Sequence, residues 1–295
     1  MTPENNHPNL DRVLSQVPAQ DREALREVWD MATLGTAGEG EHGEDVWRAL
    51  EAHTRRGPRM RLVWAGSATA ALALAATLLF FFVPVSVTAP AAEMRTVELA
   101  DGSTVLLNSG STLRHNRVFL GTRTVRLSGE AFFSVTSSNA RFIVRTHDAE
   151  VEVLGTEFSV RAWGDERDGG TTVSLVEGRV AFRALDSPET LELAPGEASR
   201  ITDSGPTPLP VQAALDAPAW RNGDFRYRDV WVSTILADLE RRFGIRVQIP
   251  VAVSDRRMTL LLTAPASPEA VLDDLTVALG VQYEAVAGGY RLVLP

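Results

Sequence analysis

The most pronounced feature of the hydrophobic pattern is an uncharged stretch between residues 62 and 92. Its core runs from Leu62 to Val83 and reads LVWAGSATAALALAATLLFFFV. As an α-helix, this 22-residue core would be about 33 Å long, enough to cross a hydrocarbon layer of about 30 Å. A soluble helix of this kind would need burial on every side, and a cleaved signal peptide would lie nearer the N-terminus. The pattern therefore predicts one transmembrane helix over residues 62–85.

The charges on either side of this stretch predict its direction. Four arginines precede it, namely Arg55, Arg56, Arg59 and Arg61. The other flank is apolar, and its first charged residue is Glu93. Because basic flanks stay in the cytoplasm, residues 1–61 are expected inside and residues 86–295 outside.

Residues 1–61 carry short helical stripes of apolar side chains, although they are too few for a robust core. Two stripes include a tryptophan, and an exposed helix face of this kind suits docking to a partner protein. A small self-packed helical bundle is the alternative. The predicted partner-binding residues of this cytoplasmic helical segment are Leu25, Val28, Trp29, Trp47 and Leu50.

From residue 93 to residue 203 the pattern changes to short alternating strands separated by turn sequences such as DG, NSGS and SSN. Segments such as TVLLN (104–108), RFIVRT (141–146) and EFSVRAW (157–163) alternate apolar and polar positions. TVRLSG (124–129) and EAFFSV (130–135) are predicted as two strands that meet at a turn or bulge around Gly129 and Glu130. Strands at this spacing predict an all-β domain, either a jelly-roll-like sandwich or a β-solenoid.

The last part of the chain combines the alternating pattern of strands with the three- and four-residue spacing of helices. Residues 204–222 contain PTPLP and are expected to form a linker. Residues 223–295 predict a small α+β domain in the order β-α-β-β-α-β-β. Gly244 is expected to end its first helix, and Ser267-Pro268 to begin the second, whose Ala270, Val271, Leu275 and Leu279 face inward. The predicted fold class is thus a multidomain membrane protein with helical, transmembrane, all-β and α+β parts.

Composition narrows the functional classes. The net charge is −9 and the pI is about 5.2, so direct contact with nucleic acid is not expected. The absence of cysteine excludes disulfides and thiol catalysis. We expect no cofactor, no metal site and no enzymatic activity. Glu150 and Glu152, with His147 and Asp148 before them, resemble metal ligands, but a solvated strand face explains them better.

Several blocks of the β region, taken in order, resemble a known family. VELADGSTVLLNSGSTLRHN, RTVRLSGEAFFSV, RFIVRTHDAEVEVLGTEFSVRAW, TTVSLVEGRVAF and LAPGEASRI are similar to successive motifs of the FecR family. This resemblance implies a regulator of an extracytoplasmic-function sigma factor, either an anti-sigma factor or an activator, in the inner membrane. The C-terminal domain is similar to the short secretin/TonB N-terminal domain, which implies a protein partner in the periplasm. The N-terminal segment departs from the usual cytoplasmic motif of the family, so sigma-factor binding is the least direct of these implications.

The same resemblance raises one chemical hypothesis. Some FecR-like proteins process themselves at a Gly-Thr bond, and VLGTEF contains Gly155-Thr156. The threonine hydroxyl would attack the preceding carbonyl. An ordinary bend before a strand is the alternative, and the dipeptide also occurs at Gly121-Thr122 and Gly170-Thr171.

Two functions compete at this point. The first is a relay of a periplasmic signal, delivered by a TonB-dependent outer-membrane receptor, to the sigma factor. The second is a structural or assembly component of the cell envelope that binds a secretion-pore or transporter protein. The ordered FecR-like blocks favour the relay.

Overall fold

The computed structural model of the chain describes residues 83–294, which all fall in one compact unit. The predicted cytoplasmic segment 1–61 and residues 62–82 of the predicted membrane helix lie outside the described residues. Within residues 83–294, no helix is long and apolar enough to span a membrane. Val85, the last residue of the predicted membrane helix, begins the first described strand.

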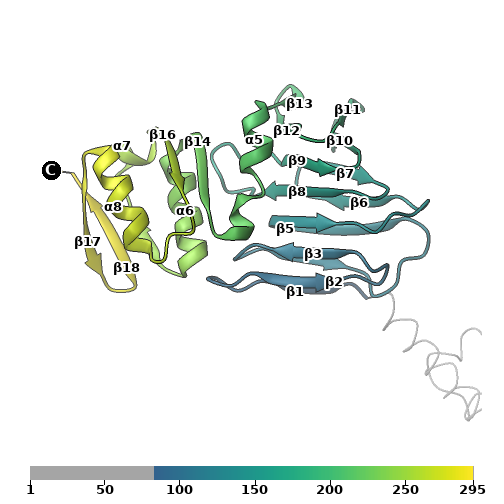
Figure 1. Cartoon of the computed structure of the whole chain (residues 1–295), viewed down its shortest axis with the longest axis horizontal. Coiled ribbons are helices and arrows are strands. Elements are labelled where there is room, and N and C mark those ends of the chain that lie inside the picture. The colour runs from purple at the N-terminus through teal and green to yellow at the C-terminus, as the bar shows by residue number, and fades with distance from the viewer. Residues whose placement is uncertain (1–82, 295) are drawn as a thin grey trace, which may run out of the picture. The chain divides into compact units, whose positions relative to one another are not determined.

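Thirteen strands build the first part of the described chain, which we call the β part (Figure 1). They form two sheets that share one long strand, β5. The first sheet contains β1 (Val85–Thr88), β4 (Thr112–His115), β5 (Arg123–Ser134), β6 (Phe142–Arg145), β7 (Ala149–Val153), β10 (Val180–Ala184) and β11 (Thr190–Leu193). The second contains β2 (Arg95–Glu98), β3 (Thr104–Leu107), β5, β8 (Glu157–Ala162), β9 (Thr172–Glu177), β12 (Ala198–Thr202) and β13 (Gly205–Pro208).

Strand β5 passes from one sheet to the other at Gly129. Its first half pairs with β4 and β6, and its second half pairs with β3 and β8. Gly129 has φ +113°, and a Cβ there would lie 2.8 Å from the Cα of Ser111, so the position requires glycine. The prediction of two strands that meet at a turn or bulge was therefore wrong, because the chain continues as one 12-residue strand that bends into the second sheet.

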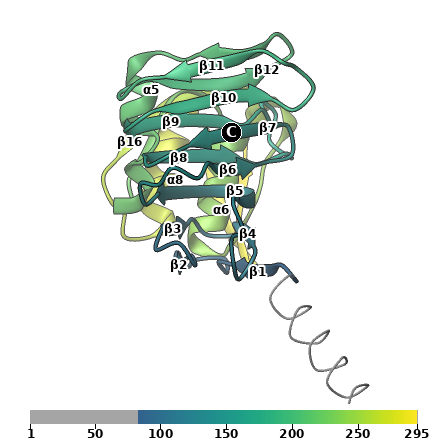
Figure 2. The same cartoon turned by 90° about the vertical axis from the view of Figure 1, so that its right-hand side faces the viewer.

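After β5, hairpins alternate between the sheets: β6–β7 in the first, β8–β9 in the second, then β10–β11 in the first and β12–β13 in the second. Figure 2 shows the strands after β5 stacked above it. The apolar faces of both sheets meet in one core. Within it the ring of Phe133 stacks on that of Phe158 with centroids 5.0 Å apart, and lies 6.3 Å from Phe142 of the other sheet. The fold is predominantly β, as expected, with face-to-face packing like a sandwich and stepwise growth like a solenoid.

The remaining residues form the C-terminal part, which surrounds a second apolar core. Its elements are α5 (Val211–Asp216), the 3₁₀ turn η2 (Ala219–Asn222), β14 (Phe225–Trp231), α6 (Val232–Phe243), β15 (Arg246–Gln248), α7 (Val251–Ser254), β16 (Arg257–Leu262), α8 (Pro268–Leu279), β17 (Gln282–Val286) and β18 (Gly289–Val293). The C-terminal part contains two small sheets of its own. In one, β14 pairs with β16, and the other has the strand order β15-β18-β17.

Both main helices of the C-terminal part lie where the sequence predicts them. Gly244 and Gly280 end α6 and α8 with left-handed φ values of 66° and 67°. Ser267 caps α8, since its hydroxyl accepts a hydrogen bond from the backbone N–H of Ala270. Ala270 is nevertheless exposed, contrary to the prediction that it faces inward.

The expected linker is also structured. Strand β13 extends the second sheet of the β part, and α5 and η2 follow it directly. The prolines of PTPLP suggested a linker, but they are compatible with β13. Pro206 and Pro208 lie on an edge strand, where the missing backbone N–H removes no hydrogen bond of the sheet. The two parts therefore follow one another without a free linker.

Candidate functional site: a charged seam between the β part and the C-terminal part

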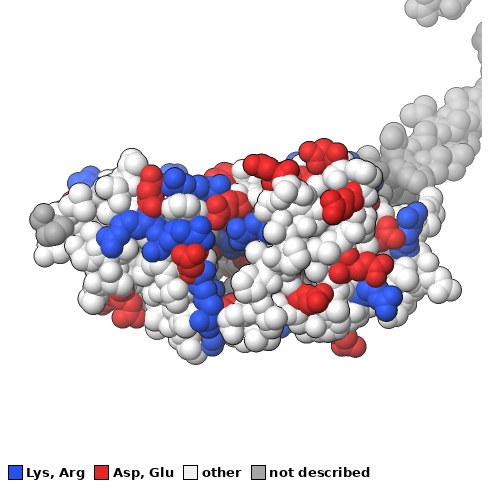
Figure 3. All heavy atoms as spheres, turned by 90° about the horizontal axis from the view of Figure 1, so that it is seen from above, with Lys and Arg blue, Asp and Glu red and all other residues white. Residues whose placement is uncertain are grey.

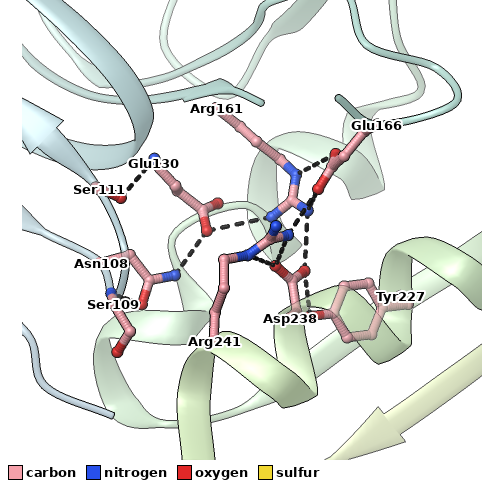
Figure 4. A network of polar contacts seen from close by, with 9 residues as sticks. All are labelled: Asn108, Ser109, Ser111, Glu130, Arg161, Glu166, Tyr227, Asp238 and Arg241. Carbon is pink, nitrogen blue, oxygen red and sulfur yellow. Dashed lines mark hydrogen bonds and ion pairs between the residues drawn. The ribbon is translucent and has the colours of Figure 1, made fainter. Parts of the chain in front are cut away.

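Seven polar side chains meet where the end of the β part contacts α6 and β14 (Figure 4). We call this group the seam. Its members are Asn108, Glu130, Arg161 and Glu166 from the β part and Tyr227, Asp238 and Arg241 from the C-terminal part.

Arg161 lies at the centre of the seam and contacts three carboxylates. Its Nη1 donates to Glu130 Oε2 at 3.2 Å, and its Nη2 lies 2.5 Å from Glu166 Oε1 and 2.9 Å from Asp238 Oδ2. The third contact crosses from the β part to the C-terminal part. Arg161 is largely shielded from water, so these charges act in a medium of low effective dielectric.

Arg241 of α6 in turn contacts the β part. Its Nη2 lies 2.8 Å from Glu166 Oε1 and 2.7 Å from Asp238 Oδ1. Its guanidinium also lies 4.0 Å from the ring centroid of Trp163, a cation–π contact across the same boundary. Asp238 in turn accepts a hydrogen bond of 2.7 Å from the hydroxyl of Tyr227.

Contacts within each part position the side chains that form the seam. Glu130 and Arg161 lie directly opposite one another on the antiparallel strands β5 and β8. Asp238 and Arg241 lie three residues apart on α6 and therefore on one face of the helix. Asn108 donates to Glu130 Oε2 at 2.7 Å and fixes the carboxylate from the side of β3.

The seam holds three carboxylates and two guanidinium groups, and this excess of negative charge appears in the pKa values. Burial, together with the nearby Asp238 and Glu166, raises the pKa of Glu130 to about 7 despite the opposing effect of Arg161. Burial raises the pKa of Glu166 as well. Burial also disfavours ionisation of Asp238, but Arg161 and Arg241 outweigh it and hold the pKa of that carboxyl below its usual value.

A cavity of about 500 Å³ adjoins the seam and is lined by residues of both parts. Arg200 and Ser174 line it from the β part, and Arg226, Arg228 and Arg242 from the C-terminal part. Figure 3 shows the hollow at the boundary, with basic side chains gathered on the side of the C-terminal part and acidic ones over the β part. The arrangement suits a contact between charged protein surfaces better than covalent chemistry.

Further contacts join the two parts around the seam. Arg167 forms an ion pair with Asp255 and lies over the ring of Trp231, 4.2 Å from its centroid. The backbone N–H of Ala92, in the loop after β1, donates to the carbonyl of Arg241 at 2.8 Å. The outer face of Phe132 is covered by Arg221 of η2, whose guanidinium lies 3.7 Å from the ring centroid.

The sequence did not predict the seam. Glu130 occupies an outward position of its strand, where charged residues normally meet water. One signal was present: Phe132 shares that outward face, since it is out of phase with the core residues Ala131 and Phe133, yet it is only 6% exposed. A large aromatic side chain on the outer face of a sheet indicates that another element covers it.

The structure places the predicted Gly155-Thr156 bond just before β8. Thr156 Oγ1 donates to the carbonyl of Arg179 at 3.2 Å, and its backbone exchanges two hydrogen bonds with Val135. A Cβ on Gly155 would lie 2.6 Å from the Cα of Ser137, so glycine is required by close packing. Self-cleavage at this bond stays a prediction. The predicted partner-binding residues Leu25, Val28, Trp29, Trp47 and Leu50 lie outside the described residues.

The acidic group around His147 is engaged in protein contacts. Glu150 accepts from Arg145 and Arg183, its cross-strand neighbours, at 2.8 and 2.7 Å, and is only 6% exposed, so it is not on a solvated face as expected. Asp148 accepts from the backbone N–H of Thr171 at 2.9 Å. Among residues 83–294 no group of three or more acidic, histidine or cysteine side chains has the geometry to hold a metal.

Comparisons with known proteins identify relatives of this architecture. Residues 85–181 match the model of the family described as FecR protein. Two crystal structures of a "putative anti-sigma factor" from Parabacteroides distasonis ATCC 8503 share 28% identity with the chain, with TM-scores of 0.66 and 0.65. Each covers 72% of this chain, and the chain covers 100% and 99% of them. A comparison with curated proteins finds no match.

These similarities extend beyond the β part, since a relative that is matched over its whole length covers nearly three quarters of the chain. They support a regulatory role. Residues 85–181 of the chain are therefore identified as a FecR-family domain.

Proposed function

We propose that the chain is a single-pass inner-membrane regulator that relays a periplasmic signal to an extracytoplasmic-function sigma factor, as an anti-sigma factor or as an activator. The observation that carries the proposal is the FecR match of residues 85–181, joined to the likeness of the solved anti-sigma structures over 72% of the chain. The uncharged stretch that precedes residue 83, with its arginine-rich N-terminal flank, supports the proposed topology.

In this proposal the C-terminal part receives the signal from a TonB-dependent outer-membrane receptor. Its similarity to the short secretin/TonB N-terminal domain motivates this assignment. Within the described residues, β14 pairs on one side only, with β16, and β17 likewise pairs only with β18. A free strand edge offers backbone N–H and C=O groups to an added strand, which is a common mode of peptide recognition.

A receptor transmits a signal only if it binds one state of the regulator more tightly than another. The seam is the natural element to distinguish two states, because it joins the proposed receptor-binding part to the part that continues toward the membrane. Receptor binding that weakens or strengthens the contacts of Arg161 and Arg241 would change how the two parts move together.

The test is capture of the full chain from membranes of its own host, followed by identification of the bound proteins. A sigma factor is expected with the full chain and is expected to be lost when residues 1–56 are deleted. The double variant Trp29→Ala, Trp47→Ala should weaken capture, whereas Arg126→Ala, an exposed position on β5 outside the proposed cytoplasmic segment, serves as the control. Capture of a secretion-pore or transporter protein without a sigma factor would favour the alternative, a structural or assembly component of the envelope.

The topology is tested separately with reporters fused to the C-terminus. A reporter active only outside the cytoplasm should be active, and a cytosolic reporter should not. The reverse result would contradict both the relay and the envelope component.

A further inference from the structure

The loop between β4 and β5, residues 116–122, exposes apolar side chains at one end of the β part. Leu120 is 71% exposed and Val118 is 40% exposed, whereas Phe119 between them packs against the core. Phe119 thus anchors the loop while its two neighbours face outward. Water is an unfavourable environment for a pair of large apolar side chains held in this way.

This loop lies beside the point where the described chain begins. Nη1 of Arg117 donates to the carbonyl oxygen of Val83 at 3.4 Å, and the register of β1 with β4 pairs Val85 with His115. Leu120 follows Arg117 by three residues, so their Cα atoms are no more than about 11 Å apart. Val83, itself 51% exposed, is the last residue of the long apolar core of the sequence.

A second apolar loop ends at the same place. Leu154, which follows β7, is 53% exposed. The buried Arg123 connects it to the first loop, since Arg123 begins β5 directly after residue 122 and its Nη2 donates to the carbonyl of Leu154 at 3.2 Å. The same guanidinium donates to the carbonyls of Thr136 and Ala140 at 2.9 and 2.7 Å. The exposed leucines are therefore held on a rigid frame.

We propose that this end of the β part rests on the outer surface of the lipid bilayer, with Val118, Leu120 and Leu154 in the interfacial layer. The proposal rests on the proposed function, because it requires residues 62–83 to cross the membrane. Strand β1 begins at Val85, only two residues after the apolar core ends, so about 7 Å of chain at most separates them. The chain contains no spacer that would carry this end away from the bilayer.

This contact would fix the orientation of the β part. The seam lies at its opposite end, around the C-terminal end of β8, so the C-terminal part would be presented away from the membrane. With the β part held at the membrane surface, receptor binding would move the C-terminal part relative to it.

The absence of cysteine in the chain permits a direct test with single-cysteine variants. Leu120→Cys and Leu154→Cys probe the two loops. Leu185→Cys is the matched control, because Leu185 is also an exposed leucine in a loop, with an exposed fraction of 46%. Its N–H donates to the carbonyl of Asp148, which precedes β7, whereas Leu154 follows the other end of that strand. Leu185 lies roughly 15–20 Å farther along the strands. Each full-length variant is labelled with an environment-sensitive fluorophore and reconstituted into phosphatidylethanolamine–phosphatidylglycerol vesicles that carry nitroxide lipids.

We expect the labels at 120 and 154 to shift to the blue and to lose at least about half of their emission to the nitroxide lipids, since interfacial apolar groups lie ~5–10 Å deep. The label at 185 should change in neither respect. Unquenched emission at 120 and 154 in protein that floats with the vesicles would overturn the membrane contact but leave the topology standing. Protein that does not float with the vesicles would overturn the topology, and the proposed function with it.

Discussion

Asp238 on α6 and Arg161 on β8 form an ion pair across the boundary of the two parts, with Oδ2 and Nη2 2.9 Å apart. Both side chains are largely shielded from water, with exposed fractions of 10% and 21%. A buried pair of this kind adds little net stability over an apolar pair, but removal of one partner leaves an uncompensated charge. The pair is therefore better understood as a device that specifies how the two parts join.

Replacement of Asp238 by asparagine tests this role. Asp238→Asn removes the carboxylate that Arg161, Arg241 and Tyr227 share, and we expect a loss of about 3–5 kcal/mol in the free energy of unfolding. Urea unfolding measures the loss, and hydrogen exchange should show faster exchange in α6. Asp229→Asn is the control, because the Asp229 side chain is 79% exposed and its pair with Arg257 should contribute less than about 1 kcal/mol. Equal losses in the two variants would contradict a special role of the seam.

Glu130 predicts a pH dependence with a definite sign. Its pKa rises from 4.5 to about 7 in the folded chain, so the folded state binds the extra proton between these values. Stability from this group is complete below pH 4.5, decreases as pH rises, and is lost above pH 7, with a total on the order of 3 kcal/mol.

The variant Glu130→Gln should remove this dependence. Glutamine keeps a side-chain oxygen for Asn108 but carries no charge, so thermal stability between pH 5 and pH 8 should become flatter than in the parent chain. The measurement is the melting temperature as a function of pH for both proteins. Glu284→Gln is the control, since that carboxylate pairs with Arg291 in water at 52% exposure. An unchanged slope in Glu130→Gln would refute the assignment of the titration to the seam.

Arg123 is expected to be the most sensitive arginine at the end of the β part near Val83. Its side chain is 4% exposed and pairs with Asp101 at 2.6 Å, besides its three carbonyl partners. Arg123→Met removes the cationic partner of the largely buried Asp101 carboxylate and the donor to the three carbonyls, and should cost about 3–5 kcal/mol in unfolding free energy. Arg126→Ala, an exposed position on the same strand, should change stability by less than about 0.5 kcal/mol. Chemical denaturation of the two variants side by side decides the point.

Self-cleavage at Gly155-Thr156 is decided by the mass of the mature protein. If the hydroxyl of Thr156 is the nucleophile, Thr156→Val should stay full length while Thr156→Ser and the control Thr122→Val are still cut. An uncut peptide across Gly155-Thr156 in all of the unmodified protein would reject the hypothesis. Gly155→Ala is a poor probe of chemistry, because its methyl group would press on Ser137 and destabilise the fold by about 1–3 kcal/mol.

Local periodicity predicted many of the described elements correctly. The β17–β18 hairpin and the helices α6 and α8 lie where their patterns place them. These elements were predictable because the spacing of apolar residues and the residues at helix ends act within a few positions of the chain. The bend of β5 at Gly129 was not, since the close approach of Ser111, the residue before β4, is what requires glycine there.

The sequence by itself determined the alternation of strands, the two capped helices and the family motifs that indicate regulation. Only the tertiary structure decided that Glu130 faces Arg161 and that Arg241 reaches Glu166, which is 75 positions away in the chain. The physical reason is that periodicity reports which face of an element is apolar but not what covers its polar face. Partners for buried charges are chosen by packing between distant segments, and no local pattern encodes that choice.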